Sequence, residues 1–328
     1  MFNSHPLADT CVVDIPNIVK EAPQVSIVVP LYNEEKSFNG LIERITAILD
    51  SFHLTIQVVL VNDGSKDNTP YLMQLLSEED KRFKSVFLSR NHGHQIAVSA
   101  GMLHADAEEA IMIIDGDLQD PPELIEEFYK KLKEGYDVIY AIRKNRKEGM
   151  MLKFAFWSYY RIQRMISNYD IPIDSGDFCM ISKRVRDIIV SMPEESRYLR
   201  GMRSWVGFKQ YGYEYDRGER HAGDSNYSLK KRVEFALNGI FNFSKYPIHI
   251  MFRLGFFSIS ISVIYTLYLL YLKFTSDALS PGFLTIIFAI SFFSGVQLIS
   301  LGLIGEYVFR TYSQVRQRPL FIIDKVIN

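Results

Sequence analysis

Cysteine is nearly absent from this sequence of 328 residues, which contains only Cys11 and Cys179. The two do not form a CxxC pair, so the sequence predicts neither a zinc cage nor a disulfide framework. Two isolated thiols fit a reducing compartment. An excess of charge of one sign is also lacking, because the formal net charge is −1. Without a basic field over the chain, we expect no nucleic-acid partner.

Features of secreted proteins and of dinucleotide-binding enzymes are missing too. Residues 1–24 have no basic start and no continuous apolar run, and they carry Asp9 and Asp14, so they do not resemble a signal peptide. We expect an N-terminal extension here and a catalytic domain that stays in the cytosol. No GxGxxG motif follows the first predicted strand, which excludes a dinucleotide-dependent dehydrogenase.

Short apolar runs that end in polar turns alternate with helix-like stretches over residues 25–191. The predicted strands are Val25–Pro30, Gln57–Val61, Ser85–Ser89, Ala110–Ile114 and Asp137–Arg143. The predicted helices are Glu34–Phe52, Thr69–Glu79, Gln95–Ala105 and Pro122–Glu134. This alternation predicts an α/β fold with a mostly parallel sheet and helices on both faces. Ligands bind beyond the carboxyl ends of such strands, so the polar residues found there are the first candidates for a site.

Two apolar segments without charge, Leu254–Leu272 and Gly282–Gly305, follow the α/β region. At ~1.5 Å per residue they reach roughly 28 and 36 Å, enough to cross a hydrocarbon core of ~30 Å. Buried core helices are the alternative. The link at 273–281 is short, so we expect an antiparallel transmembrane hairpin. Its only basic residue is Lys273, whereas both flanks are basic, which places the flanks in the cytoplasm.

Residues 228–247 begin with basic side chains and continue with apolar ones. This pattern predicts a helix that lies in the lipid headgroup region, and a surface helix packed on the soluble domain is the alternative. The predicted organisation is an extension (1–24), a catalytic domain (25–227), the juxtamembrane helix (228–247), two transmembrane helices (248–312) and a cytoplasmic tail (313–328).

The segment IMIIDGDLQDPP, Ile111–Pro122, carries the strongest chemical signal. An apolar strand ends at Asp115 and Asp117, and Gly116 between them allows close backbone approach. Two carboxylates this close repel each other unless a cation or a hydrogen-bond network offsets their charge. Oxygen ligands at a turn suit Mg²⁺ or Mn²⁺ shared with a diphosphate, and Gln119 can add a neutral oxygen. The alternative is an acidic loop that faces solvent.

Two further strand ends carry polar residues. Asp63 directly follows a predicted strand, where it can accept a hydrogen bond from a nucleotide base or form an Asx turn that caps the next helix. Asn33 is either a helix cap or a neighbour of a nucleotide pocket shaped by Pro30, Tyr32 and Glu34.

The ordered set of these segments resembles the inverting family-2 glycosyltransferases with a GT-A nucleotide-sugar fold. More narrowly, it is similar to the polyprenyl-phosphate branch, which includes dolichyl-phosphate mannose synthase and bactoprenol glucosyltransferases. The resemblance covers nearly the whole chain. It includes the segments SRNHGHQIAVSAGM (Ser89–Met102), DLQDPP (Asp117–Pro122), SGDFCMISK (Ser175–Lys183), RYLRGM (Arg197–Met202) and GDSNYSLKK (Gly223–Lys231).

The resemblance implies roles for single residues. Asp63 would contact the base, in a nucleotide-sugar pocket that also includes Pro30, Tyr32, Glu34, Asp115 and Gln119. Asp115 and Asp117, with Gln119, would hold Mg²⁺ or Mn²⁺ and the diphosphate. The implied catalytic residues are Asp177, Asp117 and Arg200, with Asp177 near the reacting carbon. The implied lipid-phosphate site comprises Arg200, Ser225, Tyr227, Lys230 and Lys231.

Three of the residues in these segments allow a different interpretation. Asp177 can also be a turn carboxylate after Gly176. His92 and His94 lie two residues apart without a third ligand, so we expect a loop role near the nucleotide rather than a metal site. Relatives often have phenylalanine and lysine or glutamate in this loop.

The implied reaction transfers a hexose, with UDP-glucose as the first expectation, to polyprenyl (undecaprenyl) phosphate with inversion. GDP-mannose or another UDP-sugar stays open as donor, and a catalytically silent membrane scaffold is the alternative from another class. A processive polysaccharide synthase would need a QxxRW segment and more spanning helices than the sequence contains. We expect a multi-pass protein of the bacterial plasma membrane that contacts membrane lipid, with both termini cytoplasmic and a homo-oligomeric state.

Overall fold

The apolar runs form an eight-stranded sheet with the order β7-β5-β6-β4-β1-β2-β3-β8. The computed structural model describes residues 22–143, 175–195, 197–216, 246–275 and 282–328. The strands are β1 (Val25–Leu31), β2 (Ile56–Asn62), β3 (Phe83–Leu88), β4 (Ala110–Ile113), β5 (Val138–Arg143), β6 (Ser175–Ser182), β7 (Gln210–Tyr215) and β8 (Ile323–Ile327). The five predicted strands are β1 to β5, with ends that differ by at most two residues.

The sheet is mostly parallel, as predicted. Strand β1 pairs in parallel with β2 and β4, β2 pairs in parallel with β3, and β5 pairs in parallel with β7. Strand β6 pairs antiparallel with β4 and β5, and β8 pairs antiparallel with β3. Every residue of β1 and β2 is buried, because helices cover both faces of the sheet at this point.

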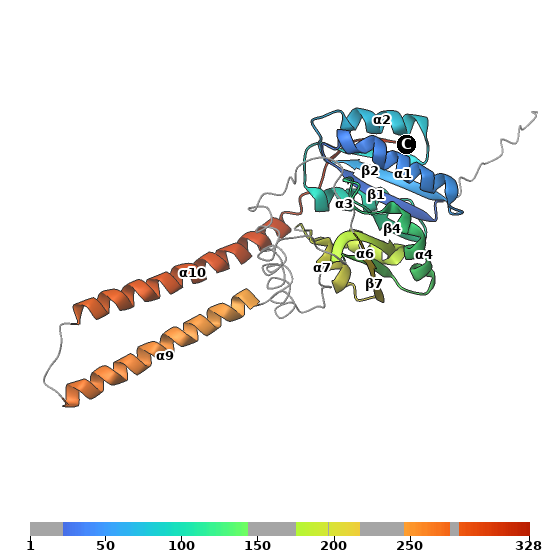
Figure 1. Ribbon diagram of the computed structural model, residues 1–328. Helices are drawn as coiled ribbons and strands as arrows, with labels where there is room; N and C mark the ends of the chain where they lie inside the picture. The colour runs from blue at the N-terminus through green and yellow to red at the C-terminus, as the bar shows by residue number, and fades with distance from the viewer. Residues whose placement is uncertain (1–21, 144–174, 196, 217–245, 276–281) are drawn as a thin grey trace, which may run out of the picture.

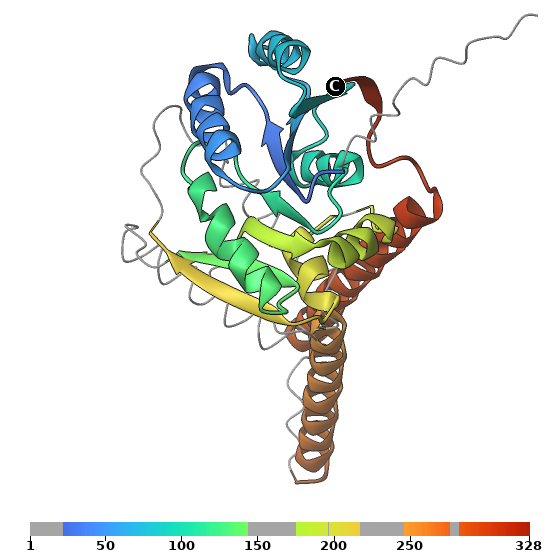
Figure 2. The ribbon, with the colours of Figure 1, turned by 90° about the vertical axis from the view of Figure 1, so that its right-hand side faces the viewer.

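Helices cover the two faces of the sheet in separate layers (Figure 2). The core of one layer joins the sheet to α1 (Glu35–Ser51), α2 (Thr69–Glu79) and α4 (Ile125–Lys133), and a 3₁₀ turn, η1 (Pro122–Leu124), precedes α4. The core of the other layer joins the sheet to α3 (His94–His104), α6 (Lys183–Ser191) and α7 (Leu199–Trp205). Helix α1 shows the pattern behind this arrangement, because its buried residues Phe38, Leu41, Ile45 and Ile48 recur at helical spacing.

The end of the chain returns to the sheet. Within residues 313–328, which were predicted to be a cytoplasmic tail, β8 pairs with β3, so that Val326 is opposite Val86. The C-terminus accordingly lies beside the α/β domain (Figure 1). Strand β8 gives hydrogen-bond partners to backbone groups of β3 that would otherwise form an open sheet edge.

Helices α9 (Tyr246–Thr275) and α10 (Phe283–Val315) project from the domain side by side (Figure 1). The hydroxyl groups of Tyr265 and Thr285 are 3.1 Å apart and join the two helices. Among the described residues, one stretch, Phe292–Val315, is long and apolar enough to cross a membrane, with a mean hydropathy of 1.4. The two-span hairpin of residues 248–312 therefore stays a prediction. Residues 217–245 lie outside the described residues, and nearly all of the predicted juxtamembrane helix is among them.

Candidate active site

The carboxyl ends of β1, β2 and β4 bring the predicted residues to one edge of the sheet. Leu31 and Asn62 are partners at the ends of β1 and β2, so Tyr32 and Asp63 follow neighbouring strands. Asp115 comes two residues after the end of β4. Gly116 packs so closely on β1 that an added Cβ would lie 2.5 Å from Cδ2 of Leu31. Glycine therefore lets the loop with Asp115 and Asp117 approach β1.

The antiparallel strand β6 brings a further carboxylate to Asp115. Ile113 on β4 is opposite Cys179 on β6. Continuing this register by two residues places Asp177 level with Asp115, because antiparallel partners move in opposite directions along the chain. Two aspartates that are 62 positions apart in the sequence thus meet beside the carboxyl end of β4.

Asp177 is the centre of a network of charged and polar side chains. The guanidinium of Arg200 donates through Nε to Oδ1 at 2.9 Å and through Nη2 to Oδ2 at 3.3 Å. The amide of Gln95 donates to Oδ2 at 2.9 Å. His94 Nε2 lies 3.5 Å from Oδ2 of Asp177 and 3.5 Å from Oδ1 of Asp115. The imidazole therefore lies between the two carboxylates.

Burial and charge shift the pKa values of this network in different directions. Burial opposes ionisation of Asp177, but Arg200 and His94 outweigh it and hold the pKa of Asp177 well below its usual value. Burial likewise opposes the charge of His94, but the hydrogen bond to Asp177 and the charges of both aspartates raise its pKa to about 9. Burial raises the pKa of Asp115 to about 6, and the charges of Asp120, Asp177 and Asp117 add to the rise. An anionic Asp177 is thus held next to a cationic imidazole.

The carboxylates of the site and the raised pKa of Asp115 bear on whether a divalent cation would fit here. Among the described residues, no three His, Cys, Asp or Glu side chains are grouped to hold a metal. Mg²⁺, however, takes one or two protein carboxylates and completes its shell with water and substrate phosphates. Asp115 and Asp117 supply such carboxylates, and a cation would favour the ionised form of Asp115, which burial and the charges of neighbouring aspartates disfavour. The oxygen donors therefore fit Mg²⁺ or Mn²⁺ shared with a diphosphate.

Gln119 holds the acidic loop through its backbone. Its N–H donates to Oδ1 of Asp117 at 3.2 Å, and Leu118 between them has a positive φ of 61°. A non-glycine residue rarely adopts this conformation, so the loop after β4 has a defined shape. Whether the side-chain oxygen of Gln119 joins a metal shell stays a prediction.

Asp63 joins two loops at the same edge of the sheet. It is 3% exposed, and its carboxylate accepts hydrogen bonds from the backbone N–H groups of His92 (2.7 Å) and Gly93 (2.9 Å). Burial raises its pKa, although these two hydrogen bonds act in the opposite direction. Asp63 thereby holds the β3–α3 loop that leads directly into His94. The predicted contact between Asp63 and a base remains a prediction.

The β1–α1 loop is fastened to the β2–α2 loop. Asn33, at a φ of 56°, donates from its N–H to Ser65 Oγ at 3.0 Å and accepts at Oδ1 from the N–H of Lys66 at 2.8 Å. Asn33 is not the helix cap, because Glu34 is the residue that precedes α1. The carboxylate of Glu34 accepts from Ser37 Oγ at 2.6 Å. Pro30 is buried within β1 and Tyr32 is half-buried after it, so these side chains lie near the same edge.

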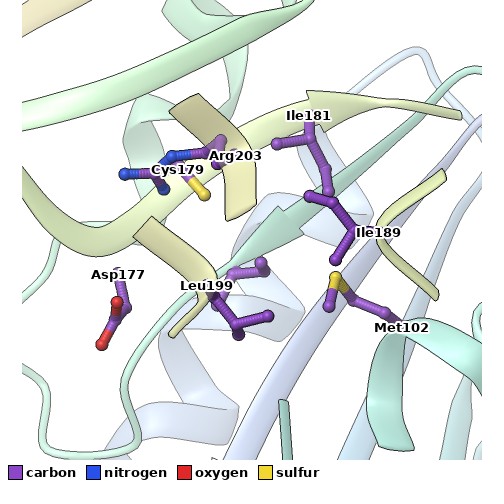
Figure 3. A pocket seen from close by; sticks show the side chains of 8 residues that line it. Met102, Asp177, Cys179, Ile181, Ile189, Leu199 and Arg203 are labelled. Atoms are coloured by element: carbon purple, nitrogen blue, oxygen red, sulfur yellow. The ribbon is translucent and has the colours of Figure 1, made fainter. Parts of the chain in front are cut away.

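A narrow pocket extends from Asp177 into the second layer of the core (Figure 3). Asp177 and Leu199 lie at one end of the group, whereas Met102 and Ile189 lie further along it. The buried guanidinium of Arg203 lines the pocket and donates to the carbonyl of Gly176 at 3.2 Å. The pocket is lined mostly by apolar side chains, which pack beneath the charged network.

The structure brings together Asp115, Asp177 and Arg200, three of the predicted site residues. It adds Gln95, which had no predicted role, and His94, which was predicted only as part of a loop near the nucleotide. His94 and Gln95 occupy the first turn of α3, at the carboxyl edge of the sheet where candidates were expected. Their position after β3 indicated that they could belong to the site. Their partners could not be predicted, because these lie 21 to 104 residues away in the sequence. The predicted phosphate-binding residues Ser225, Tyr227, Lys230 and Lys231 lie outside the described residues.

Comparison with known proteins decides the family. Residues 26–188 match Glycosyl transferase family 2. The chain is 42% identical over 303 residues to the uncharacterized glycosyltransferase YkcC of Bacillus subtilis, with 92% of this chain and 94% of that protein covered. The chain belongs to glycosyltransferase family 2. The α/β domain described above is accordingly the GT-A-like catalytic domain of a glycosyltransferase.

Further relatives of this glycosyltransferase indicate which branch of the family it resembles. It is 34% identical over 305 residues to the prophage bactoprenol glucosyl transferase homolog of Escherichia coli K12, with 92% of this chain and 99% of that protein covered. Such relatives confirm the predicted resemblance to the polyprenyl-phosphate branch. A solved mannosyltransferase from Pyrobaculum calidifontis in complex with GDP-mannose and Mn²⁺ is 14% identical, with 67% of this chain and 64% of that chain covered and a TM-score of 0.46. We draw no conclusion from that weaker similarity.

Proposed function

We propose that this glycosyltransferase moves a hexose from a nucleotide-sugar to a polyprenyl phosphate at the cytoplasmic face of the plasma membrane. The observation that carries the proposal is the linked set of Asp115, His94, Asp177 and Arg200 at the strand ends. It combines a carboxylate suited to a cation with a guanidinium suited to a phosphate. UDP-glucose is the proposed donor, supported by relatives named as bactoprenol glucosyl transferases.

The donor diphosphate would bind at the acidic loop after β4. Asp115 and Asp117 would hold Mg²⁺ or Mn²⁺, which would supply positive charge to a departing nucleoside diphosphate. His94, with its pKa raised to about 9, adds a positive charge beside Asp115. Neighbouring loops from β1 and β2 would receive the nucleoside, where Tyr32 and Asp63 lie.

A phosphate acceptor suits a site that contains an arginine. A phosphate monoester carries about 1.5 to 2 negative charges at neutral pH, so it can attack the anomeric carbon without first losing a proton. Arg200 would orient this phosphate, and Asp177 would lie beside the reacting carbon. Direct displacement would invert the anomeric centre and give a β-linked product from an α-linked donor. Positioning would contribute more than general-base catalysis.

The projecting helices support a lipid acceptor. Large apolar side chains on α9 and α10 are exposed, among them Phe256 at 74%, Ile264 at 67% and Leu298 at 69%. Contiguous apolar surface of this kind is rare on soluble proteins and marks contact with a membrane or partner. We propose that both helices span the bilayer as a hairpin and hold the catalytic site at its surface, with both termini in the cytoplasm. A homo-oligomeric state is also proposed, and the family resemblance is its only support.

Purified full-length protein in detergent, incubated with undecaprenyl phosphate and a panel of labelled nucleotide-sugars, tests the proposal. We expect a lipid-linked sugar product with one donor, dependent on added Mg²⁺ or Mn²⁺. Asp115→Asn should lower the transfer rate at least ~100-fold, because a metal ion contributes several kcal/mol of charge stabilisation in the transition state.

Asp50→Asn is the matched control, since Asp50 is exposed on α1 and pairs with Arg82. This variant should transfer at the wild-type rate. Full activity of Asp115→Asn with added metal would contradict the metal assignment. Absence of transfer from every donor by the wild-type protein would contradict the proposed function itself.

A further inference from the structure

Gln95 connects three elements of the site through one side-chain amide. It lies in the first turn of α3. Its Nε2 donates to Oδ2 of Asp177 on β6 at 2.9 Å, and its Oε1 accepts from the backbone N–H of Leu199 at 3.0 Å. Leu199 is the first residue of α7. One residue therefore joins the starts of two helices and a carboxylate on the sheet.

The chemistry of the two contacts fixes the orientation of this amide. An amide offers donors on nitrogen and an acceptor on oxygen. If the Gln95 amide were rotated by half a turn, its oxygen would face the carboxylate of Asp177 and its NH₂ group would face the N–H of Leu199. Both contacts would then be repulsive, so only the observed orientation satisfies them.

Gln95 thereby holds both members of the pair formed by Asp177 and Arg200. Arg200 immediately follows Leu199, so the contact with the Leu199 N–H sets where the Arg200 backbone begins in α7. The other contact restrains the carboxylate that accepts from Arg200 at 2.9 Å. Gln95 itself is carried by a helix that cannot shift easily, because residues 97–102 are all buried.

We propose that Gln95 is a positioning residue that keeps Asp177 and the start of α7 in place while Arg200 binds the acceptor phosphate. This inference rests on the proposed function. An incoming phosphate competes with Asp177 for the guanidinium, because both are anions that accept its hydrogen bonds. When Arg200 turns toward the phosphate, Asp177 loses a partner, and the hydrogen bond from Gln95 retains its orientation toward the reacting carbon.

Gln95→Met tests this role, because methionine has a similar length and makes neither hydrogen bond. We expect kcat to fall about 10- to 100-fold, the usual effect of removing a hydrogen bond to a charged group. The dissociation constant of the nucleotide-sugar should stay within about twofold of the wild-type value, since Gln95 contacts no predicted donor residue. Because two hydrogen bonds are lost, the melting temperature should fall by several degrees, and the protein should stay folded at the assay temperature.

A double-mutant cycle with Asp177→Asn asks whether Gln95 acts through Asp177. In single-turnover assays, Gln95→Met should reduce the rate more in the Asp177 enzyme than in the Asp177→Asn background, where asparagine keeps one acceptor oxygen and the contact with Leu199 remains. An equal loss in both backgrounds would overturn the proposal. If Asp177→Asn has no measurable transfer, Gln95→Met alone still tests the proposal. An unchanged kcat would overturn the role of Gln95. A fall in kcat that is fully explained by unfolding at the assay temperature would overturn it as well.

Gln74→Met is the matched control for the chemistry of the substitution. Gln74 is a partly buried glutamine on α2 whose amide contacts Glu78 and Lys325, away from the site. Its variant should keep wild-type kcat.

The outcomes for the two proposals are separable, because the wild-type protein must transfer sugar for the proposed function to hold. Normal wild-type transfer together with full activity of Gln95→Met would overturn only the role of Gln95.

Discussion

His94 shows how one side chain can stabilise a crowded acidic site. Three aspartates, Asp115, Asp117 and Asp177, meet at the carboxyl edge of the sheet, and their charges act against each other. The imidazole lies 3.5 Å from two of them. It supplies a positive charge beside Asp115, while Arg200 supplies one to Asp177. The sequence offered His94 only as a member of a loop.

This position predicts a pH dependence of stability. The pKa of His94 is raised from 6.5 to about 9, because the hydrogen bond to Asp177 and the charges of Asp115 and Asp177 outweigh burial and the charge of Arg200. The folded protein therefore binds this proton more tightly than the unfolded chain does. The resulting stabilisation is complete below pH 6.5 and is lost as the pH rises toward 9.

Melting curves in metal-free buffer between pH 6 and 9.5 measure this effect. The wild-type melting temperature should fall over this range by at least about 2 °C more than that of His94→Gln, since 1 kcal/mol corresponds to ~2–4 °C in a domain of this size. His53→Gln, at an exposed position, should behave as the wild type does. Parallel curves for wild type and His94→Gln would contradict the stabilising role of the imidazolium.

At the scale of elements, helix α3 determines how closely the site is held to the sheet. Gly101 faces β1 and β2, and an added Cβ would overlap Cγ1 of Val28 and lie 2.9 Å from Cγ2 of Val61. The absence of a side chain lets the helix backbone approach the strands. Since α3 carries His94 and Gln95 at its start, this close packing also places the charged network.

Gly101→Ala should therefore destabilise the protein by about 1–3 kcal/mol, the usual cost of overpacking a core. The melting temperature measures the loss. Gly40→Ala in α1 is the matched control, because its new Cβ would lie 3.4 Å from Cδ1 of Leu118, an ordinary contact. Alanine favours a helix over glycine by about 1 kcal/mol, so the control should be at least as stable as wild type. Equal stability of Gly101→Ala and wild type would contradict the packing argument.

At the scale of the whole molecule, Gln314 joins α10 to the catalytic domain through two hydrogen bonds. Gln314, near the end of α10, donates to the carbonyl of Pro193 at 2.5 Å and accepts from the N–H of Glu195 at 3.1 Å. Strand β8 then completes the sheet beside β3, where the Ser89 N–H donates to the carbonyl of Ile322 at 2.9 Å. The chain after α10 is thus part of the domain, and this connection orients α10 relative to the active site.

The proposed membrane hairpin predicts the behaviour of a charge placed on α10. Leu298 is 69% exposed in the middle of the helix. A charged residue at the centre of a spanning helix costs ~2.5–3.5 kcal/mol on insertion scales, so Leu298→Asp should lower the fraction of protein that remains in carbonate-washed membranes. Tyr71→Asp, at a side chain 63% exposed on α2, should leave that fraction unchanged. Recovery of the wild-type protein in the detergent-free supernatant would contradict the hairpin.

The sequence by itself determined the features that depend on local pattern. Buried parallel strands require continuous apolar runs, so β1 to β5 were predicted to within two residues, and α2 was predicted with its observed ends. Asp115 and Asp117 were identified because they directly follow such a run. The family resemblance was also readable, since it rests on the order of short segments along the chain.

Only the tertiary structure decided which side chains meet. The sequence did not indicate that β6 runs antiparallel beside β4, and this register places Asp177 level with Asp115. It likewise did not indicate that Gln95 reaches Leu199, 104 residues away, or that residues 323–327 complete the sheet. Local periodicity reports which face of an element is buried, whereas strand order and register depend on the packing of all elements together.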